Sequence, residues 1–262
     1  MNLDLTGRHA LVCGASQGIG RAAAQALAAL GATVTLLARD VHALEAVRDA
    51  LPASGGRRHH FLSVDFDSPE ELRALLANAL PDLPPVAILV NNTGGPPAGP
   101  AHLAHTDEYL AAFRRHLVCN QILVQAVLPG MRTAGYGRII NIISTSVKEP
   151  IKGLGVSNTV RGAVASWAKT LAGELGPEGI TVNNVLPGYT RTQRLAMLFA
   201  ARAEKTGRPL AEIEAEALAQ IPLGRFAEAE EIANAVAFLA SPAASYINGV
   251  NLPVDGGRIQ SL

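Results

Sequence analysis

Seven short runs of apolar, mostly β-branched residues alternate along the chain with longer segments of helical spacing. The runs are Ala10–Cys13, Thr33–Leu37, Phe61–Val64, Val86–Val90, Ile139–Ile143, Thr181–Leu186 and Val250–Val254. They are apolar on both faces, and the segments between them are long enough for crossover helices, as in a buried parallel sheet. Because such crossovers are right-handed, the alternation predicts an α/β fold with one doubly wound parallel sheet and helices on both faces.

The segments between the runs predict helices near Ile19–Leu30, Val41–Leu51, Pro69–Leu80, Asp107–Thr133, Asn158–Leu175 and Ala229–Ala240. The link from Tyr189 to Pro222 is different because it is long and contains helical pieces around Leu195–Glu204 and Leu210–Leu218. A link of this kind is typical of an active-site lid. With no repeat and no interdomain linker, residues 1–262 are expected to form a single domain.

Composition excludes several classes of protein. Hydrophobic residues make up 48% of the chain, enough for a large core, and 22 basic residues balance 22 acidic ones. A net charge of zero does not favour nucleic acid or an anionic membrane, so the substrate is expected to be small or carrier-bound. The uncharged stretch Ala22–Ala38 is interrupted by polar residues and glycine, so we expect no membrane span.

The cysteines and histidines point to neither disulfides nor a metal. Cys13 and Cys119 fall in a predicted strand and a predicted helix, and residues 1–8 lack the pattern of an export signal, so a cytoplasmic location is expected. The seven histidines have no cysteine or carboxylate partners at ligand spacing, so no metal site is expected. The basic patch Ala53–His60 is interpreted as a solvated turn, with anion binding as the alternative.

A glycine-rich turn, Cys13–Gly20, joins the first strand to the first helix. Its glycines, Gly14, Gly18 and Gly20, follow the pattern Gly-x-x-x-Gly-x-Gly. Such a turn requires residues that tolerate positive φ and leaves the free N–H groups of a helix N-terminus facing an anion. An ordinary glycine-rich turn is the alternative, but the position between strand and helix predicts a site for a dinucleotide pyrophosphate.

At this point the chain resembles the short-chain dehydrogenase/reductase family, and the resemblance covers nearly its whole length. Further matching motifs are Asn91–Gly94 (Asn-Asn-Thr-Gly), Asn141–Ser144 (Asn-Ile-Ile-Ser), Pro187–Gly188 with Thr192, and Val254–Gly257 (Val-Asp-Gly-Gly). In particular the chain is similar to the 3-oxoacyl-(acyl carrier protein) reductase subgroup. The resemblance implies a Rossmann-type fold whose cofactor-binding residues are Gly14, Ser16, Gln17, Gly18, Ile19, Gly20, Arg39, Asp65, Asn91, Thr93, Gly94, Pro187, Gly188 and Thr192.

Cofactor preference depends on the end of the second strand, where the sequence reads Ala38-Arg39-Asp40. The resemblance places Ala38 where NAD-dependent members carry an acid and Arg39 where NADP-dependent members carry a base, so NADP(H) is favoured over NAD(H). Gln17 replaces a second basic residue often found in NADP-dependent members, and Asp40 could serve as a helix cap. Asp65 matches the aspartate of the family that contacts adenine, or is a turn residue.

The proton relay of the family is not conserved in type. The resemblance implies a Tyr-x-x-x-Lys motif, but Ser157 and Arg161 occupy those positions, and His116 occupies the position of an asparagine. Ser144 alone keeps the expected residue type. A serine hydroxyl is far less acidic than a phenol, and arginine does not release a proton, so neither residue can simply replace its counterpart. Arg161 could hold ribose hydroxyls or form a surface or interface salt bridge.

Three other residues are candidate acids. Lys148 follows Ser144 in the loop after the fifth strand, where burial could lower its pKa, or it is solvated and paired with Glu149. His116 could relay protons near neutral pH, or it is a packing residue of its helix. Tyr189 could be a phenolic acid, although lining the nicotinamide pocket is the simpler role. The catalytic candidates are therefore Ser144, Lys148, Ser157, Arg161 and His116.

The expected function is an NADP(H)-dependent carbonyl/alcohol oxidoreductase with a non-standard proton relay. Two alternatives stay open: a non-catalytic or regulatory dinucleotide-binding protein, and a lyase or isomerase with Lys148 as its base. Apolar and basic residues are mixed in the lid, which permits an acyl chain or an anionic group on the substrate. The resemblance also implies a homotetramer or homodimer through the two long helices, with the apolar residues Val160, Val164, Trp167 and Leu171 at the interface.

Overall fold

The computed structural model describes residues 1–53 and 58–261, and it contains one parallel sheet with the strand order β3-β2-β1-β4-β5-β6-β7. The strands are β1 His9–Cys13, β2 Thr33–Ala38, β3 His60–Ser63, β4 Ile88–Asn91, β5 Gly137–Ile142, β6 Ile180–Pro187 and β7 Asn251–Val254. Each contains most of one predicted apolar run. The predicted fold class is therefore confirmed, and the order reverses between β1 and β4, the point at which open α/β sheets bind ligands.

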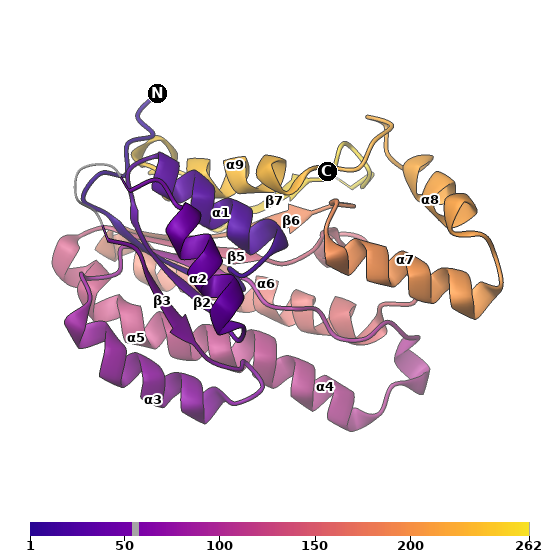
Figure 1. Ribbon diagram of the computed structural model, residues 1–262, viewed down its shortest axis with the longest axis horizontal. Coiled ribbons are helices and arrows are strands. Elements are labelled where there is room, and N and C mark those ends of the chain that lie inside the picture. The colour runs from indigo at the N-terminus through magenta and orange to yellow at the C-terminus, as the bar shows by residue number, and fades with distance from the viewer. Residues whose placement is uncertain (54–57, 262) are drawn as a thin grey trace.

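Helices cover both faces of the sheet (Figure 1). One face carries the helices α1 Gly18–Ala29, α2 Val41–Ala50 and α9 Ala229–Ala240, and the other carries α3 Pro69–Ala79, α5 Cys119–Ala134 and α6 Gly155–Leu175. Successive side chains of β1 alternate between these two layers: Ala10 and Val12 pack into the first, and Leu11 and Cys13 into the second. This burial on both faces explains why the run that forms β1 is apolar on both faces.

The predicted helix Asp107–Thr133 is present but is not α-helical throughout. It consists of α4 (Thr106–Phe113), a π-helical turn (Arg114–Val118) and α5. A π-helical turn leaves the apolar periodicity almost unchanged, so the pattern in the sequence did not reveal it. The turn places His116 inside the molecule, with 2% of its surface exposed.

The predicted lid contains two helices, α7 (Gln193–Thr206) and α8 (Leu210–Leu218), which extend beyond the ends of β6 and β7 (Figure 1). The α7–α8 segment, residues 189–222, has an apolar cluster of its own in which Phe199 and Ile213 are buried. The rings of Tyr189 and Phe226 pack against that of Phe199. This cluster holds the two helices together at the carboxyl end of the sheet.

Two expectations from the sequence need correction. Val160 and Val164 are only 2% and 1% exposed and pack inside the chain, so they offer no apolar surface to a second copy. Residues 54–57 of the predicted turn Ala53–His60 lie outside the described residues, but His59 is not solvated. It is buried, and its Nδ1 accepts a hydrogen bond from the Val34 N–H. None of the helices in the described part of the chain is long and apolar enough to span a membrane.

Candidate functional site

A cavity of about 620 Å³ opens at the carboxyl edge of the sheet, beside the point where the strand order reverses. Residues predicted to bind the cofactor line it: Gly14, Ser16, Gln17, Gly18, Ile19, Arg39, Asp65, Thr93, Gly94, Pro187, Gly188 and Thr192. Of the catalytic candidates, Ser144, Ser157 and Arg161 line it, whereas Lys148 and His116 do not. The structure therefore brings together in one cavity segments that are far apart in the sequence.

The glycine-rich turn has the geometry of a phosphate cradle. Gly14 and Gly18 have φ values of +59° and +53°, which favour glycine. No side chain caps the N-terminus of α1, and no acid lies in its first turn, so its N–H groups are available to an anion in the cavity. Gly20 does not line the cavity. A Cβ on Gly20 would lie 2.1 Å from the Gly14 carbonyl oxygen, so its lack of a side chain lets α1 begin directly against the turn.

Asn91 also lies outside the cavity wall. It belongs to a row of asparagines, most of them buried, that joins neighbouring strands at paired positions. The Asn91 amide donates to Asn141, that of Asn141 to Asn184 and that of Asn184 to Asn251, each at 2.8 Å. The structure thus places Asn91 in the sheet, where the row links β4, β5, β6 and β7 side by side.

Asn92 is a cavity residue that the sequence analysis quoted within a motif but did not select. Its side-chain amide donates to the carbonyl oxygens of Cys13 and Gly14, each at 3.3 Å. It also lines the cavity. Asn92 therefore ties the end of β4 to the glycine-rich turn, and its position directly after a buried strand was the signal that could have identified it.

The end of the cavity beside β2 and β3 contains paired charges. Nη1 of Arg39 lies 3.3 Å from Oδ2 of Asp65. The Asp67 N–H and, to a lesser extent, Arg39 hold the pKa of Asp65 below its usual value, so this carboxylate is charged. Asp40 acts as a helix cap, since its side chain accepts from the Ala43 N–H at 3.0 Å. Asp65 also accepts from the Asp67 N–H, as a turn residue does.

At the other end, beyond β5, two hydroxyl groups lie near a buried cation. Oγ of Ser144 accepts from the Ser146 N–H at 3.0 Å. Ser157 lines the cavity, and its side-chain hydroxyl makes no hydrogen bond with the described residues. Arg161 is 9% exposed and donates from Nη1 to the Ile142 carbonyl oxygen at 2.7 Å. We call Ser144, Ser157 and Arg161 the reacting end of the cavity.

His116 is held in its neutral form. Its Nδ1 lies 2.5 Å from Oγ1 of Thr93, and its Nε2 is buried with no partner among the described residues. Burial, reinforced by the charges of Arg161 and Arg115, lowers the pKa of His116 to about 2. A histidine with this pKa does not gain and lose a proton near neutral pH. The geometry instead suits an uncharged residue that holds Thr93 by a hydrogen bond. Thr93 in turn lines the cavity next to Gly94.

The other candidate acids differ in position. Lys148 is half-buried after β5 but does not line the cavity. Tyr189 does line it, and its ring packs against Phe199 and Phe226 while the Arg258 guanidinium lies 4.7 Å from its centre. Tyr189 therefore forms part of an apolar wall. Within residues 1–53 and 58–261, no three histidine, cysteine or acidic side chains are grouped so that they could hold a metal ion.

Comparison with known proteins agrees with this geometry. Residues 14–258 match the family model described as Enoyl-(Acyl carrier protein) reductase. The chain is 37% identical over 262 residues to 3-oxoacyl-[acyl-carrier-protein] reductase FabG of Pseudomonas aeruginosa, with 99% of this chain and 100% of the relative covered. The chain belongs to the short-chain dehydrogenase/reductase family.

Solved structures of two reductases have the same fold. L-sorbose reductase from Gluconobacter frateurii, complexed with NADPH and L-sorbose, superimposes with a TM-score of 0.92 at 30% identity, and both chains are covered completely. A 3-oxoacyl (acyl-carrier-protein) reductase from Agrobacterium tumefaciens C58 with NADP bound has a TM-score of 0.85 at 27% identity, with 97% and 95% coverage. This protein is thus a member of an oxidoreductase family, and Ser157 and Arg161 line its cavity while the buried His116 contacts Thr93.

Proposed function

We propose that this protein is an NADP(H)-dependent oxidoreductase that interconverts a carbonyl compound and an alcohol. The observation that supports the proposal most directly is that the uncapped N-terminus of α1 and the reacting end line the same cavity. A bound nicotinamide would supply or accept the hydride. The glycine-rich turn and Thr192 would hold the pyrophosphate, and Pro187–Gly188 would lie against the nicotinamide.

The reacting end would stabilise charge on the substrate oxygen. The hydroxyl groups of Ser144 and Ser157 would donate hydrogen bonds to the carbonyl, and the permanent charge of Arg161 would favour the alkoxide that forms as hydride arrives. The proton that completes the alcohol would come from solvent, because neither a serine nor an arginine releases one near neutral pH. His116 would act indirectly, by fixing Thr93 from inside the protein.

NADP(H) is the proposed cofactor because a largely exposed cation, Arg39, lies where the adenosine ribose would sit and pairs only at its inner side with Asp65. The Arg39 guanidinium is 70% exposed at the end of β2 and would pair with a 2′-phosphate, while the neighbouring Ala38 offers no carboxylate to a 2′-hydroxyl. NADP or NADPH in the two solved relatives supports this preference.

The principal competing function is a non-catalytic protein that binds the dinucleotide, and the loss of the tyrosine and lysine favours it. A lyase or isomerase with Lys148 as base has less support, since Lys148 does not line the cavity. The retained Ser144 and the open space beside Ser157 are more simply explained by a substrate.

The deciding experiment follows NADPH absorbance with ketones, 3-oxoacyl thioesters and small alcohols between about pH 5 and about pH 10. Ser144→Ala and Ser157→Ala should each lower kcat by about 10- to 1,000-fold while NADPH affinity is retained, because each removes a donor to the developing charge. Lys148→Met serves as the matched control outside the cavity and should keep its activity. Tight NADPH binding without turnover of any compound would establish the non-catalytic alternative.

Assembly and location complete the proposal. We propose a homodimer or homotetramer in a reducing cytoplasm, where the two buried thiols, Cys13 and Cys119, stay free. On α4, Leu110 and Phe113 are 59% and 41% exposed and supply apolar surface that Val160 and Val164 do not. A light-scattering mass equal to one chain would exclude this assembly.

A further inference from the structure

Two guanidinium groups lie on either side of a short stretch of backbone at the reacting end. Arg161, on α6, donates to the Ile142 carbonyl oxygen at 2.7 Å, and Nη2 of Arg194, on α7, donates to the Pro96 carbonyl oxygen at 2.6 Å. A Cβ on Gly95 would lie 3.4 Å from Nη2 of Arg194 and 3.9 Å from Nη2 of Arg161. Both residues line the cavity. Two positive charges from different helices therefore converge on one place.

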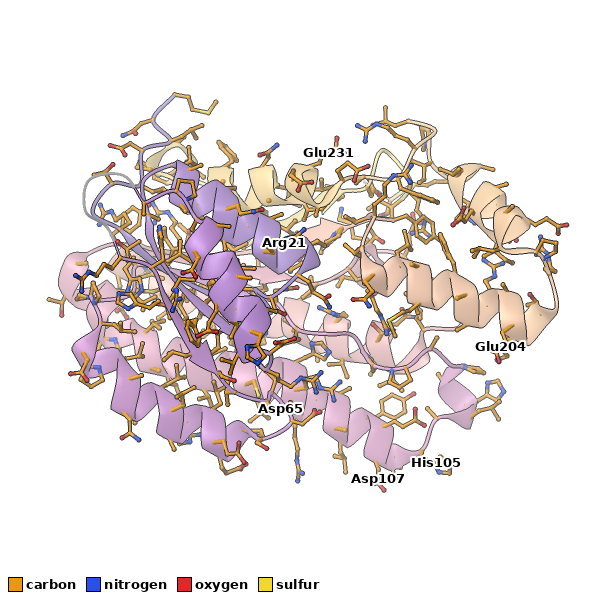
Figure 2. All side chains as sticks on the ribbon, viewed as in Figure 1. Arg21, Asp65, His105, Asp107, Glu204 and Glu231 are labelled. Carbon is orange, nitrogen blue, oxygen red and sulfur yellow. The ribbon has the colours of Figure 1, made fainter. Side chains whose placement is uncertain are left out.

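Neither charge has an acidic partner. Among residues 1–53 and 58–261, no carboxylate oxygen lies within 4.0 Å of the Arg161 or Arg194 guanidinium. Arginines of the α7–α8 segment that do not line the cavity are different, because Glu228, Glu216 and Glu212 pair with Arg191, Arg202 and Arg208. Acidic residues are thus available in this segment. Glu204, also on α7, is another, and it lies far from Asp65 at the opposite end of the cavity (Figure 2). Arg194 lacks such a partner where it faces the cavity.

The unpaired arrangement is unfavourable for the isolated protein. Burial, together with the charge of Arg194, lowers the pKa of Arg161 to about 10, so Arg161 stays charged at neutral pH in a place that disfavours charge. Burial also lowers the pKa of Arg194. An uncompensated pair of this kind reduces stability, and it is characteristic of a site whose missing charge arrives with a ligand.

We propose that the substrate of this oxidoreductase carries a carboxylate, which Arg194 and Arg161 hold, on an apolar body that lies against Ile151, Leu154 and Met197. Those three side chains line the same cavity. Guanidinium groups recognise carboxylates through paired, charge-assisted hydrogen bonds. The phosphates of the cofactor are the other source of negative charge, but the uncapped N-terminus of α1 and Arg39 already provide for them. An oxo acid of medium chain length therefore fits this end of the cavity better than a neutral ketone.

The inference rests on the proposed function, and it is tested with acids and their methyl esters: 2-oxooctanoate, 4-oxooctanoate and the two matching esters, each with NADPH. Arg194→Met should raise the KM for the acids by about 10-fold or more while it leaves the KM for the esters and the Kd for NADPH within about twofold. Arg202→Gln is the matched control, since this arginine lies on the same helix, is ion-paired and does not line the cavity. It should change none of these values.

A binding measurement separates this inference from the proposed function. Octanoate, which cannot be reduced, is titrated by calorimetry into protein saturated with NADP⁺. Binding that is lost in Arg194→Met supports the carboxylate site even if no compound is turned over, in which case the proposed function alone fails. Absence of octanoate binding to the unaltered protein overturns the carboxylate site. So does an equal rise in KM for acids and esters, or a loss confined to NADPH affinity, because Arg194 would then serve the cofactor.

Discussion

The two ends of the cavity differ in how completely the protein satisfies its own groups. We call the part of the cavity formed by the turn Cys13–Gly20, Arg39 and Asp65 the cofactor end. There Arg39 pairs with Asp65, and Gly14 and Gly18 have the positive φ values that the turn requires. At the reacting end, the Ser157 hydroxyl has no hydrogen-bond partner and Arg161 no acidic partner in the described chain. The first end thus combines a backbone cradle with an ion pair, whereas the second holds an unbonded hydroxyl and a cation without an acidic partner.

The difference separates binding from chemistry. A cradle made from the backbone tolerates almost no change of residue, but it says little about the reaction. Unpaired polar groups reduce stability and are retained where a ligand completes them. We therefore expect substitutions in the glycine-rich turn to weaken cofactor binding most, and those at the reacting end to change rate or specificity.

The largest effect is expected at Gly20. A Cβ there would meet the Gly14 carbonyl oxygen at 2.1 Å, and because that atom belongs to the backbone, the turn itself would have to move. Gly20→Ala should weaken NADPH binding by about 100-fold or more, since the N–H groups of α1 would lose their alignment. Fluorescence titration with NADPH measures the change.

Gly173→Ala is the control for Gly20→Ala. Gly173 lies in α6, and a Cβ there would meet nothing within 4 Å. Removing this glycine from a helix should stabilise the fold by about 0.5–1 kcal/mol and leave NADPH affinity unchanged. Normal NADPH binding by Gly20→Ala would show that the turn is not the cradle described above.

Arg161 should affect the rate more than the binding of cofactor. Arg161→Met removes the buried cation of the reacting end, and kcat/KM for carbonyl reduction should fall by about 100-fold. Arg161→Lys keeps the charge but loses the planar fork, so part of the rate should return. Steady-state kinetics with NADPH measure both variants. Equal losses in Met and Lys variants would mean that the hydrogen bond to Ile142, and not the charge, is what matters.

The sequence predicted the parts of the cavity that depend on the backbone better than the parts that depend on contacts between side chains. The strand runs, the turn Cys13–Gly20 and most of the cavity wall were predictable because they depend on local periodicity and on motifs of fixed spacing. The π-helical turn at His116 was not, since its extra residue scarcely alters the apolar pattern. Motif membership also failed to separate Asn91, which joins strands, from Asn92, which holds the turn.

Charge pairing was beyond the sequence. The mixed lid permitted an acyl chain or an anionic group, and nothing in its order of residues distinguished Arg194 from Arg202. Only the fold shows that Arg202 meets Glu216 while Arg194 reaches the Pro96 carbonyl beside Arg161. Such pairings depend on contacts between α7, α8 and the loop after β4, which residue spacing does not specify.

His116 offers a test of its neutral state through stability. Its pKa is about 2 in the folded protein and about 6.5 when unfolded, so below pH 6.5 the unfolded chain binds a proton that the folded protein excludes. Stability is therefore lost as pH falls, by about 2 kcal/mol from this group between pH 7 and pH 5. His116→Asn should remove that part of the loss, as urea unfolding at both pH values can measure. An unchanged pH dependence would place a charged imidazole in the folded protein.

The smallest effect is expected from Arg39, because its guanidinium is 70% exposed and its interactions are screened by solvent. Arg39→Ala should reduce affinity for NADPH by about 10-fold and leave affinity for NADH unchanged, since only NADPH carries the 2′-phosphate. Added salt should shrink the difference. Arg48→Ala is the control, because Arg48 pairs with Asp49 and does not line the cavity. Equal losses for both cofactors would mean that Arg39 contacts the adenosine they share. Arg39 would then not select NADP(H) over NAD(H).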